Sequence, residues 1–179
     1  MASPQTLSES DRRLVAGWAA DCAERVLELF EAEAPGDDRP RRLIERACAY
    51  ARGELDTAGE IRRRFAGGVG AGEVETQAAA AAARAAGQAA AVAHMGAHAL
   101  GAAAYAVRAV ALARPDRPDL VDEEVAWQLG HMTPEVRAAL AQLPPVGEDR
   151  SGPLGPGMLS SGELGEIVRR LQAGIVSGA

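Results

Sequence analysis

The sequence has few aromatic residues, no lysine and only two cysteines. Phenylalanine, tryptophan and tyrosine together make up 3% of the 179 residues, so a folded core has to be built mainly from small aliphatic side chains. Cys22 and Cys48 form no CxxC pair, and a disulfide framework is not expected. The expected location is therefore the reducing cytoplasm.

Long hydrophobic runs are also missing. The first residues show neither the basic region nor the apolar segment of a secretory signal. The least polar stretch, residues 78–113, is mostly alanine and contains Arg84 and Arg108. An arginine at membrane depth costs about 2.5–3.5 kcal/mol, so no membrane association is expected. The formal net charge of −6 argues against a general nucleic-acid-binding protein.

The short motifs of the common enzyme classes do not occur either. The sequence has no GxSxG nucleophile elbow, no P-loop and no GxGxxG dinucleotide fingerprint. A hydrolase, kinase or dehydrogenase is therefore not supported, and a non-enzymatic role is expected. Hydrophobic residues make up 47% and charged residues 25% of the chain, as is typical of a globular protein.

Alanine is abundant, and apolar residues recur at helical spacing between recognisable start and stop signals. Alanine and arginine both favour helices. A first helix is predicted from a cap at Ser8 or Ser10 to about Ala34. Four further helices are expected to start at the following residues: Asp38, Thr57 (a capping box, with Ile61 and Phe65 inside the helix), Asp119 and Thr133.

The region from Glu73 to Ala113 is too long for one helix of a compact domain. A break at Met95-Gly96-Ala97 is expected to divide it into two antiparallel helices. The predicted fold is all-α: a compact bundle of six or seven helices with an Ala-rich central helix pair and a linker-connected C-terminal helix. The predicted divisions are an all-helical domain at 8–145, a Gly/Pro-rich linker at 146–159 and an amphipathic helix at 160–175.

Acidic residues gather in two segments. Residues 1–34 carry seven acids and three arginines, and residues 119–149 carry seven acids and one arginine. The fold is therefore expected to have an acidic face. Most of these charges are expected simply to solvate exposed helix surfaces. Asp21 and Arg25 are four residues apart and are expected to pair with each other on the first helix.

A second candidate group lies in the Ala-rich region. If one helix continued from His94 to Arg108, then His94, His98, Tyr105 and Arg108 would form a polar stripe able to line a ligand site. His94 and His98 have the spacing of helical metal ligands, and zinc or another divalent metal is the only cofactor that the sequence suggests. The alternative is that these side chains fill gaps between Ala-rich helices with their polar ends hydrogen-bonded.

Several short runs resemble the immunity proteins of bacterial polymorphic-toxin systems, in the all-helical group related to the fifth numbered immunity family. The resemblance covers roughly residues 10–142. The runs that carry it are Trp18–Leu27 (WAADCAERVL), Asp38–Arg41 (DRPR), Ala82–Gly87 (AARAAG), Ala93-His94, His98-Ala99, Gly101–Ala106 (GAAAYA) and Trp127–Leu129 (WQL).

This resemblance implies a binding protein that neutralises a cognate toxin domain and so protects its producer. The residues similar to the family's polar positions are Asp21, Arg25, Asp38, Arg39, His94, His98 and Tyr105. A bundle that binds a metal or small molecule at His94, His98 and Tyr105 is the alternative function. The chain could also form a homo-oligomer, for which the C-terminal helix is the candidate contact.

Overall fold

The computed structural model describes residues 3–63 and 68–178, and this part of the chain is all-helical, without a strand. The all-α prediction is therefore confirmed. The described residues form two short 3₁₀ helices and nine α-helices: η1 (Pro4–Thr6), α1 (Glu9–Glu24), α2 (Leu27–Glu31), α3 (Arg39–Ala51), α4 (Thr57–Arg63), α5 (Gln77–Ala91), α6 (His98–Ala113), α7 (Pro118–Gly130), α8 (Pro134–Leu140), η2 (Met158–Ser160) and α9 (Gly162–Ser177).

Short polar side chains start several of these helices, as the sequence predicts. The hydroxyl of Ser8 accepts a hydrogen bond from the backbone N–H of Asp11, and the hydroxyl of Thr133 accepts one from Val136. Helix α4 differs from the prediction, because Asp56 rather than Thr57 accepts the capping bond, from Gly59 at 2.7 Å. Phe65, predicted to belong to the same helix, lies outside the described residues.

The first predicted helix is in fact two helices, which is one reason why the count exceeds the six or seven expected. Helix α1 ends at Glu24, and Val26 adopts φ −114° and ψ 0°, outside the helical region. The change of direction buries Val26, Leu27 and Phe30 in the core. Burial of three large apolar side chains thus favours a break that no glycine or proline marks.

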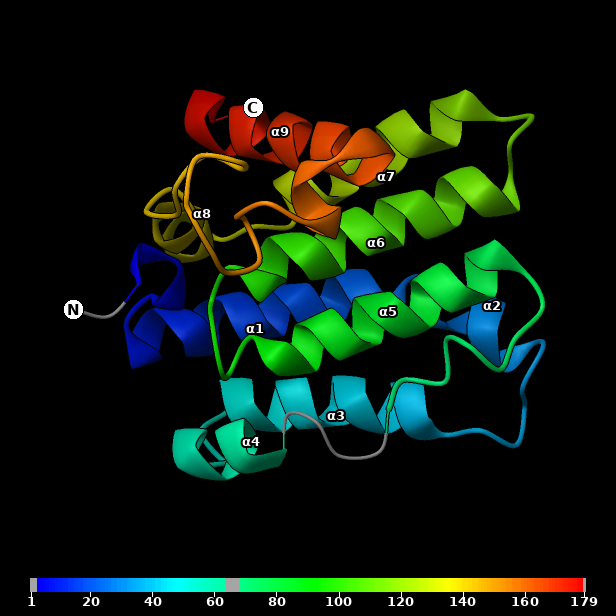
Figure 1. Ribbon diagram of the computed structural model, residues 1–179, viewed down its shortest axis with the longest axis horizontal. Helices are drawn as coiled ribbons and strands as arrows, with labels where there is room; N and C mark the ends of the chain where they lie inside the picture. The colour runs from blue at the N-terminus through cyan, green and yellow to red at the C-terminus, as the bar shows by residue number, and fades with distance from the viewer. Residues whose placement is uncertain (1–2, 64–67, 179) are drawn as a thin grey trace.

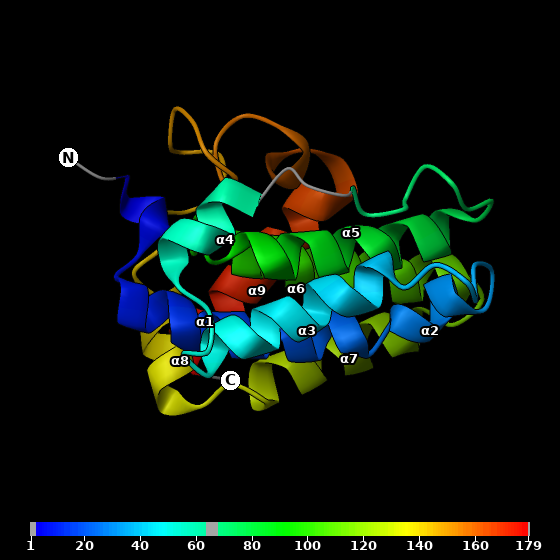
Figure 2. The same ribbon diagram turned by 90° about the horizontal axis from the view of Figure 1, so that it is seen from below.

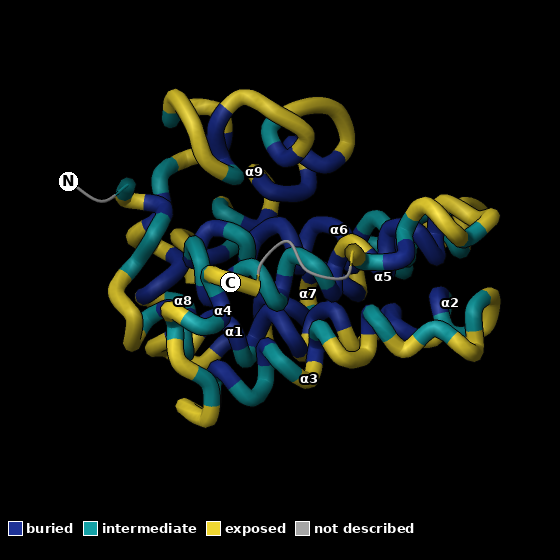
Figure 3. The backbone as a smooth tube through the Cα atoms, turned by 60° about the horizontal axis from the view of Figure 1, so that its bottom comes forward, coloured by how far each residue is buried: buried dark blue, intermediate teal, exposed yellow. Residues whose placement is uncertain are grey.

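Helices α5 and α6 form the centre of the molecule and run antiparallel (Figure 1). The break between them, at residues 92–97, includes the predicted Met95-Gly96-Ala97 and confirms the Ala-rich central pair. Gly101 permits their close approach, since a Cβ atom there would lie 2.3 Å from Oε1 of Gln88. Figure 3 shows that the buried positions run through these central helices, while the exposed ones gather in the connections.

The other helices surround this pair in layers. Helices α1 and α3 pack against α5 on one side, and α7 and α9 cover α6 on the other (Figures 1 and 2). None of the helices in the described part of the chain has the length and apolar character that a membrane crossing requires.

The C-terminal part of the chain packs closely on the bundle. Leu154, in the irregular segment before α9, is completely buried. The side chain of Gln5 accepts a hydrogen bond from the backbone N–H of Leu154 at 2.9 Å and donates to the carbonyl of Ser151 at 2.6 Å. Helix α9 then buries the predicted apolar residues Leu164, Ile167, Val168 and Leu171.

Candidate functional site

The contact between α1 and α7 contains a stacked group of three side chains, Arg25, Trp127 and His131, called the Trp127 stack below. The guanidinium carbon of Arg25 lies 3.9 Å from the centroid of the Trp127 ring. The imidazole of His131 stacks on the same indole at 4.4 Å between centroids and 15° between planes. The indole is therefore held between a cation and a second ring, at the surface of the protein.

Buried polar groups hold the stack in place. The carboxylate of Glu124, only 4% exposed, accepts a hydrogen bond from Nε of Arg25 at 2.8 Å and another from Nε2 of Gln128 at 3.0 Å. Nε1 of Trp18 donates to the carbonyl of Gln128 at 3.0 Å. The ion pair with the buried Glu124 therefore fixes the guanidinium of Arg25 against the Trp127 ring.

The predicted pairing of Asp21 with Arg25 is wrong. Arg25 lies at the break after α1 and reaches Glu124 on α7, while Asp21 lies 3.3 Å from Nε2 of His131. Both residues therefore contact α7 instead of each other. Helical spacing predicts a pair only while the helix continues through both positions, and here it ends at Glu24.

The same contact brings the two acidic segments of the sequence together. Helices α1 and α2 expose Asp21, Glu24 and Glu28, and α7 exposes Asp122 and Glu123. Asp122 forms an ion pair with Arg170 of α9 at 2.8 Å. The other carboxylates add negative charge around the Trp127 stack, whose own Arg25 is already neutralised by Glu124.

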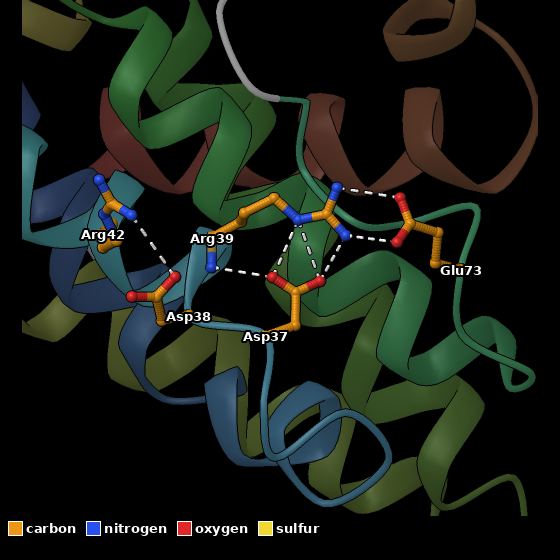
Figure 4. Close-up of polar contacts among 5 residues, drawn as sticks. All are labelled: Asp37, Asp38, Arg39, Arg42 and Glu73. Carbon is orange, nitrogen blue, oxygen red and sulfur yellow. Dashed lines mark hydrogen bonds and ion pairs between the residues drawn. The ribbon is translucent and has the colours of Figure 1, made fainter.

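A second cluster lies at the start of α3 (Figure 4). The guanidinium of Arg39 donates to Asp37 at 2.9 Å and to both carboxylate oxygens of Glu73, at 2.9 and 2.6 Å. These bonds lower the pKa of both carboxyl groups and raise the pKa of Arg39. Arg39 therefore ties α3 to the loop before α5.

Asp38 has a smaller role in this cluster than its position suggests. The sequence offers both Asp37 and Asp38 as caps of α3, and the capping bond from the backbone N–H of Arg39 goes to Asp37, at 3.0 Å. The Asp38 carboxylate is 67% exposed and lies 3.7 Å from Arg42. Asp38 is thus open to solvent, whereas Arg39 is already bound by two carboxylates.

The third group of candidate residues lies at the start of α6 and along that helix. His94 lies in the connection before the helix and His98 is its first residue, so no continuous helix joins the two imidazoles. Their ring centroids are nevertheless 6.3 Å apart. Nδ1 of His98 lies 2.8 Å from Oε1 of Gln88, and burial together with His94 lowers the pKa of His98 to about 4.

The rest of the expected polar stripe is present on α6 but is covered by the C-terminal segment. Tyr105 is buried, and its hydroxyl lies 3.8 Å from the sulfur of Met158. Arg108 lies 3.5 Å from the carboxylate of Glu163. Tyr105 therefore packs against η2, while Arg108 reaches the start of α9 and also lines an open hollow with Arg84 and Leu112.

The next question is whether other metal-ligating side chains accompany the two histidines. Within residues 3–63 and 68–178, no group of three or more histidine, cysteine, aspartate or glutamate side chains is placed to hold a metal ion. Cys22 is buried in α1, where desolvation raises the pKa of its thiol well above the usual value. Metal binding at His94 and His98 stays a prediction.

Sequence reasoning assigned no binding role to Glu124, Trp127 or His131. A signal for them exists, since the spacing of three and then four residues places all three on one side of α7. What the sequence does not show is that this side meets Arg25, which lies 99 residues before Glu124.

Comparison with known protein families identifies the family of this chain. The family model described as Imm-5 like putative immunity protein matches residues 5–135. This range includes the Trp127 stack, the Arg39 cluster and all of α6, and ends within α8. No curated protein and no solved structure matches the chain.

Proposed function

The chain belongs to the family of Imm-5 like putative immunity proteins, and on that premise we propose that it binds a cognate toxin domain and neutralises it without catalysing a reaction. The site of action is the cytoplasm of the producing cell, where such a toxin would otherwise reach its target. The family match supports the immunity role. The Trp127 stack supports the choice of binding surface.

The composition of the stack suits a protein interface. Tryptophan and arginine are the residues most enriched among those that dominate binding energy in interfaces. Here the two occur together: Arg25 lies over the Trp127 ring and is held by Glu124, which also accepts a hydrogen bond from Gln128. Since little side-chain freedom is left to lose, a partner that covers the indole gains binding energy at a low entropic cost.

The charge around the stack suits a basic partner. The chain has a net charge of −6, α1, α2 and α7 carry exposed acids, and one of these, Asp21, lies 3.3 Å from His131 of the stack. Opposite charge speeds association, and a nuclease domain that binds nucleic acid presents a basic surface. A basic nuclease toxin is therefore the partner class that this face fits best.

The direct test mixes the purified chain with the purified toxin domain encoded by the adjoining gene. We expect a one-to-one complex in size-exclusion chromatography with light scattering, and loss of toxin activity in the mixture. The variant Trp127→Ala is expected to weaken binding by about thirtyfold, as for a residue that dominates an interface.

Val176→Ala is the matched control, because Val176 is an 81% exposed apolar side chain on α9, away from the stack. It should bind like the unchanged protein, and circular dichroism should show both variants folded. No complex with the adjoining gene product would refute the function. An unchanged affinity of Trp127→Ala would refute the binding surface alone.

The alternative function rests on the proximity of His94 and His98. A divalent metal held by both imidazoles would raise the melting temperature of the purified protein when zinc or nickel is added, and His94→Ala would remove that increase. An unchanged melting temperature, with no metal found by elemental analysis, would contradict it.

A further inference from the structure

A large hollow opens at the end of the bundle where α2, the start of α5 and the end of α6 meet. Its volume is about 580 Å³, within the range of cavities that hold small ligands or single large side chains. Its walls include four aliphatic side chains, those of Leu29, Ala32, Ala78 and Leu112. No residue of the Trp127 stack lines it.

Two carboxylates, together with Thr76, Gln77 and Ala113, also line the hollow. Glu28 is exposed, and no hydrogen bond or ion pair joins its carboxylate to another described residue. Glu33 accepts hydrogen bonds from the hydroxyl of Thr76 and from the backbone N–H groups of Glu75 and Thr76, at 2.9 and 3.2 Å. These bonds lower the pKa of Glu33, so its carboxylate is ionised at neutral pH.

The helix ends around the hollow add to its negative character. Helix α2 ends at Glu31 and α6 ends at Ala113, and the C-terminal end of a helix carries partial negative charge. The opposite end of α5 also reaches the hollow, but Glu33 already accepts from its capping residue Thr76. Among the described residues, no arginine lines this hollow; Arg84 and Arg108 line a neighbouring hollow that shares Thr76, Gln77 and Leu112 with it.

An apolar chamber with a negative lining matches one kind of side chain. Lysine and arginine bury an aliphatic stem against apolar surface and keep a cationic end group among carboxylates or solvent. A carboxylate or phosphate would meet repulsion from Glu28 and Glu33, and a purely apolar group would leave the unpartnered Glu28 without a counter-ion. The hollow thus selects an alkyl chain that ends in a cation.

We propose that this hollow receives a lysine or arginine side chain that the toxin domain presents. The inference rests on the proposed function and adds a second contact to it. Glu28, which lines the hollow, follows Arg25 of the Trp127 stack by three residues in the chain. The proposal assigns both places to one partner.

Binding of the toxin domain of the adjoining gene, measured by calorimetry, tests the proposal. Ala32→Trp fills the hollow and Glu28→Gln removes its unpartnered charge, and each is expected to weaken binding about tenfold. The controls Ala173→Trp and Glu166→Gln make the same changes at exposed positions of α9 and should bind like the unchanged protein. Wild-type affinity in both Ala32→Trp and Glu28→Gln would overturn the inference while leaving the proposed function standing.

A small probe examines the hollow without the toxin. Butylguanidine carries an alkyl stem and a cation, and butylurea is its uncharged analogue. In amide NMR spectra, millimolar butylguanidine is expected to cause saturable shifts at Ala32, Ala78 and Ala113, which Ala32→Trp abolishes and butylurea does not produce. Equal shifts with butylurea, or none with butylguanidine, would refute the chemistry of the hollow. Saturable shifts in a chain that forms no toxin complex would refute the proposed function, and with it the toxin as the source of the side chain.

Discussion

At the scale of single residues, His98 lies where a proton is costly to bind. Its ring is held between α5 and α6, and burial with the nearby His94 lowers its pKa from 6.5 to about 4. The unfolded chain therefore takes up a proton near pH 6.5, and the folded chain only near pH 4. Proton uptake by the unfolded state lowers stability, so the contribution of neutral His98 is complete above pH 6.5 and is lost as the pH falls toward 4.

The variant His98→Gln isolates this effect, because glutamine is polar and does not titrate. Between about pH 7 and pH 4, we expect the free energy of unfolding of the unchanged protein to fall by about 2–3 kcal/mol more than that of His98→Gln. Urea unfolding followed by circular dichroism at each pH measures both values. The carboxylates titrate alike in the two proteins and cancel. Parallel curves would show that His98 keeps an ordinary pKa.

Residue pairs show which contacts a sequence can reveal. Arg39 and Asp37 are two positions apart and form the hydrogen bonds of a local turn. Opposite charges this close together at the start of a helix are visible in the sequence, so this contact can be predicted. Arg25 and Glu124 are 99 positions apart, and no spacing rule joins them. Their contact depends on the break after α1 and on the way α7 lies against it. The sequence therefore shows which charged and aromatic residues are available for the proposed binding surface, but it does not show that they lie together.

At the scale of helices, the close approach of α5 and α6 depends on Gly101. A Cβ atom at this position would lie 2.3 Å from Oε1 of Gln88 and 2.9 Å from a methyl group of Leu159. Gln88 is not free to move away without cost, because it bonds to His98. We expect Gly101→Ala to lower the free energy of unfolding by about 1–3 kcal/mol, the usual cost of overpacking.

Gly130→Ala serves as its control. Gly130 is the last residue of α7, and nothing lies within 4 Å of a Cβ atom built there. Alanine favours helix and restricts the unfolded chain, so this change is expected to be neutral or slightly stabilising. Urea unfolding of both variants gives the comparison. Equal stability of Gly101→Ala and the unchanged protein would mean that α5 and α6 can separate freely at this point.

Helix boundaries could be predicted wherever a local chemical signal marks them. Ser8 and Thr133 cap the helices that the sequence assigns to them, and Gly96 lies in the break at residues 92–97 that separates the two Ala-rich helices. The break at Val26 carries no such signal, since it is stabilised by burial of Leu27 and Phe30 against the rest of the bundle. Packing against distant residues decides that boundary, and a short stretch of sequence does not show such packing.

At the scale of the whole molecule, the acidic segments can be counted along the sequence, whereas their positions relative to each other depend on how the helices pack. Counting acids along the chain identifies two acidic segments, and only the fold shows that they meet at α1 and α7, around Arg25 and Glu124. The hollow between α2, α5 and α6 is a property of the assembled bundle alone. For these reasons the acidic charge can be read from the sequence, whereas the two surfaces proposed to contact a partner are visible only in the structure.

The hydrophobic core extends beyond the region that the family model matches. That region ends at residue 135, yet Leu154, Leu164, Val168, Leu171 and Ile175 are all buried in the same core. Burial of one such side chain contributes about 1.5–3 kcal/mol, so the five together contribute an amount similar to the whole stability of a typical domain, about 5–15 kcal/mol. Gln5 would also lose its bonds to Ser151 and Leu154 if this segment were removed.

Removal of residues 147–179 is therefore expected to abolish cooperative unfolding. Calorimetry of the shortened chain should show no sharp transition, and proteolysis should cut it within α6 and α7, whose outer faces α9 covers. Val176→Ser, a change at an exposed position of α9, should melt like the unchanged protein. A shortened chain that melted at the temperature of the unchanged protein would show that residues 1–146 fold without the C-terminal segment. The C-terminal segment would then be an addition to the immunity domain and not part of its core.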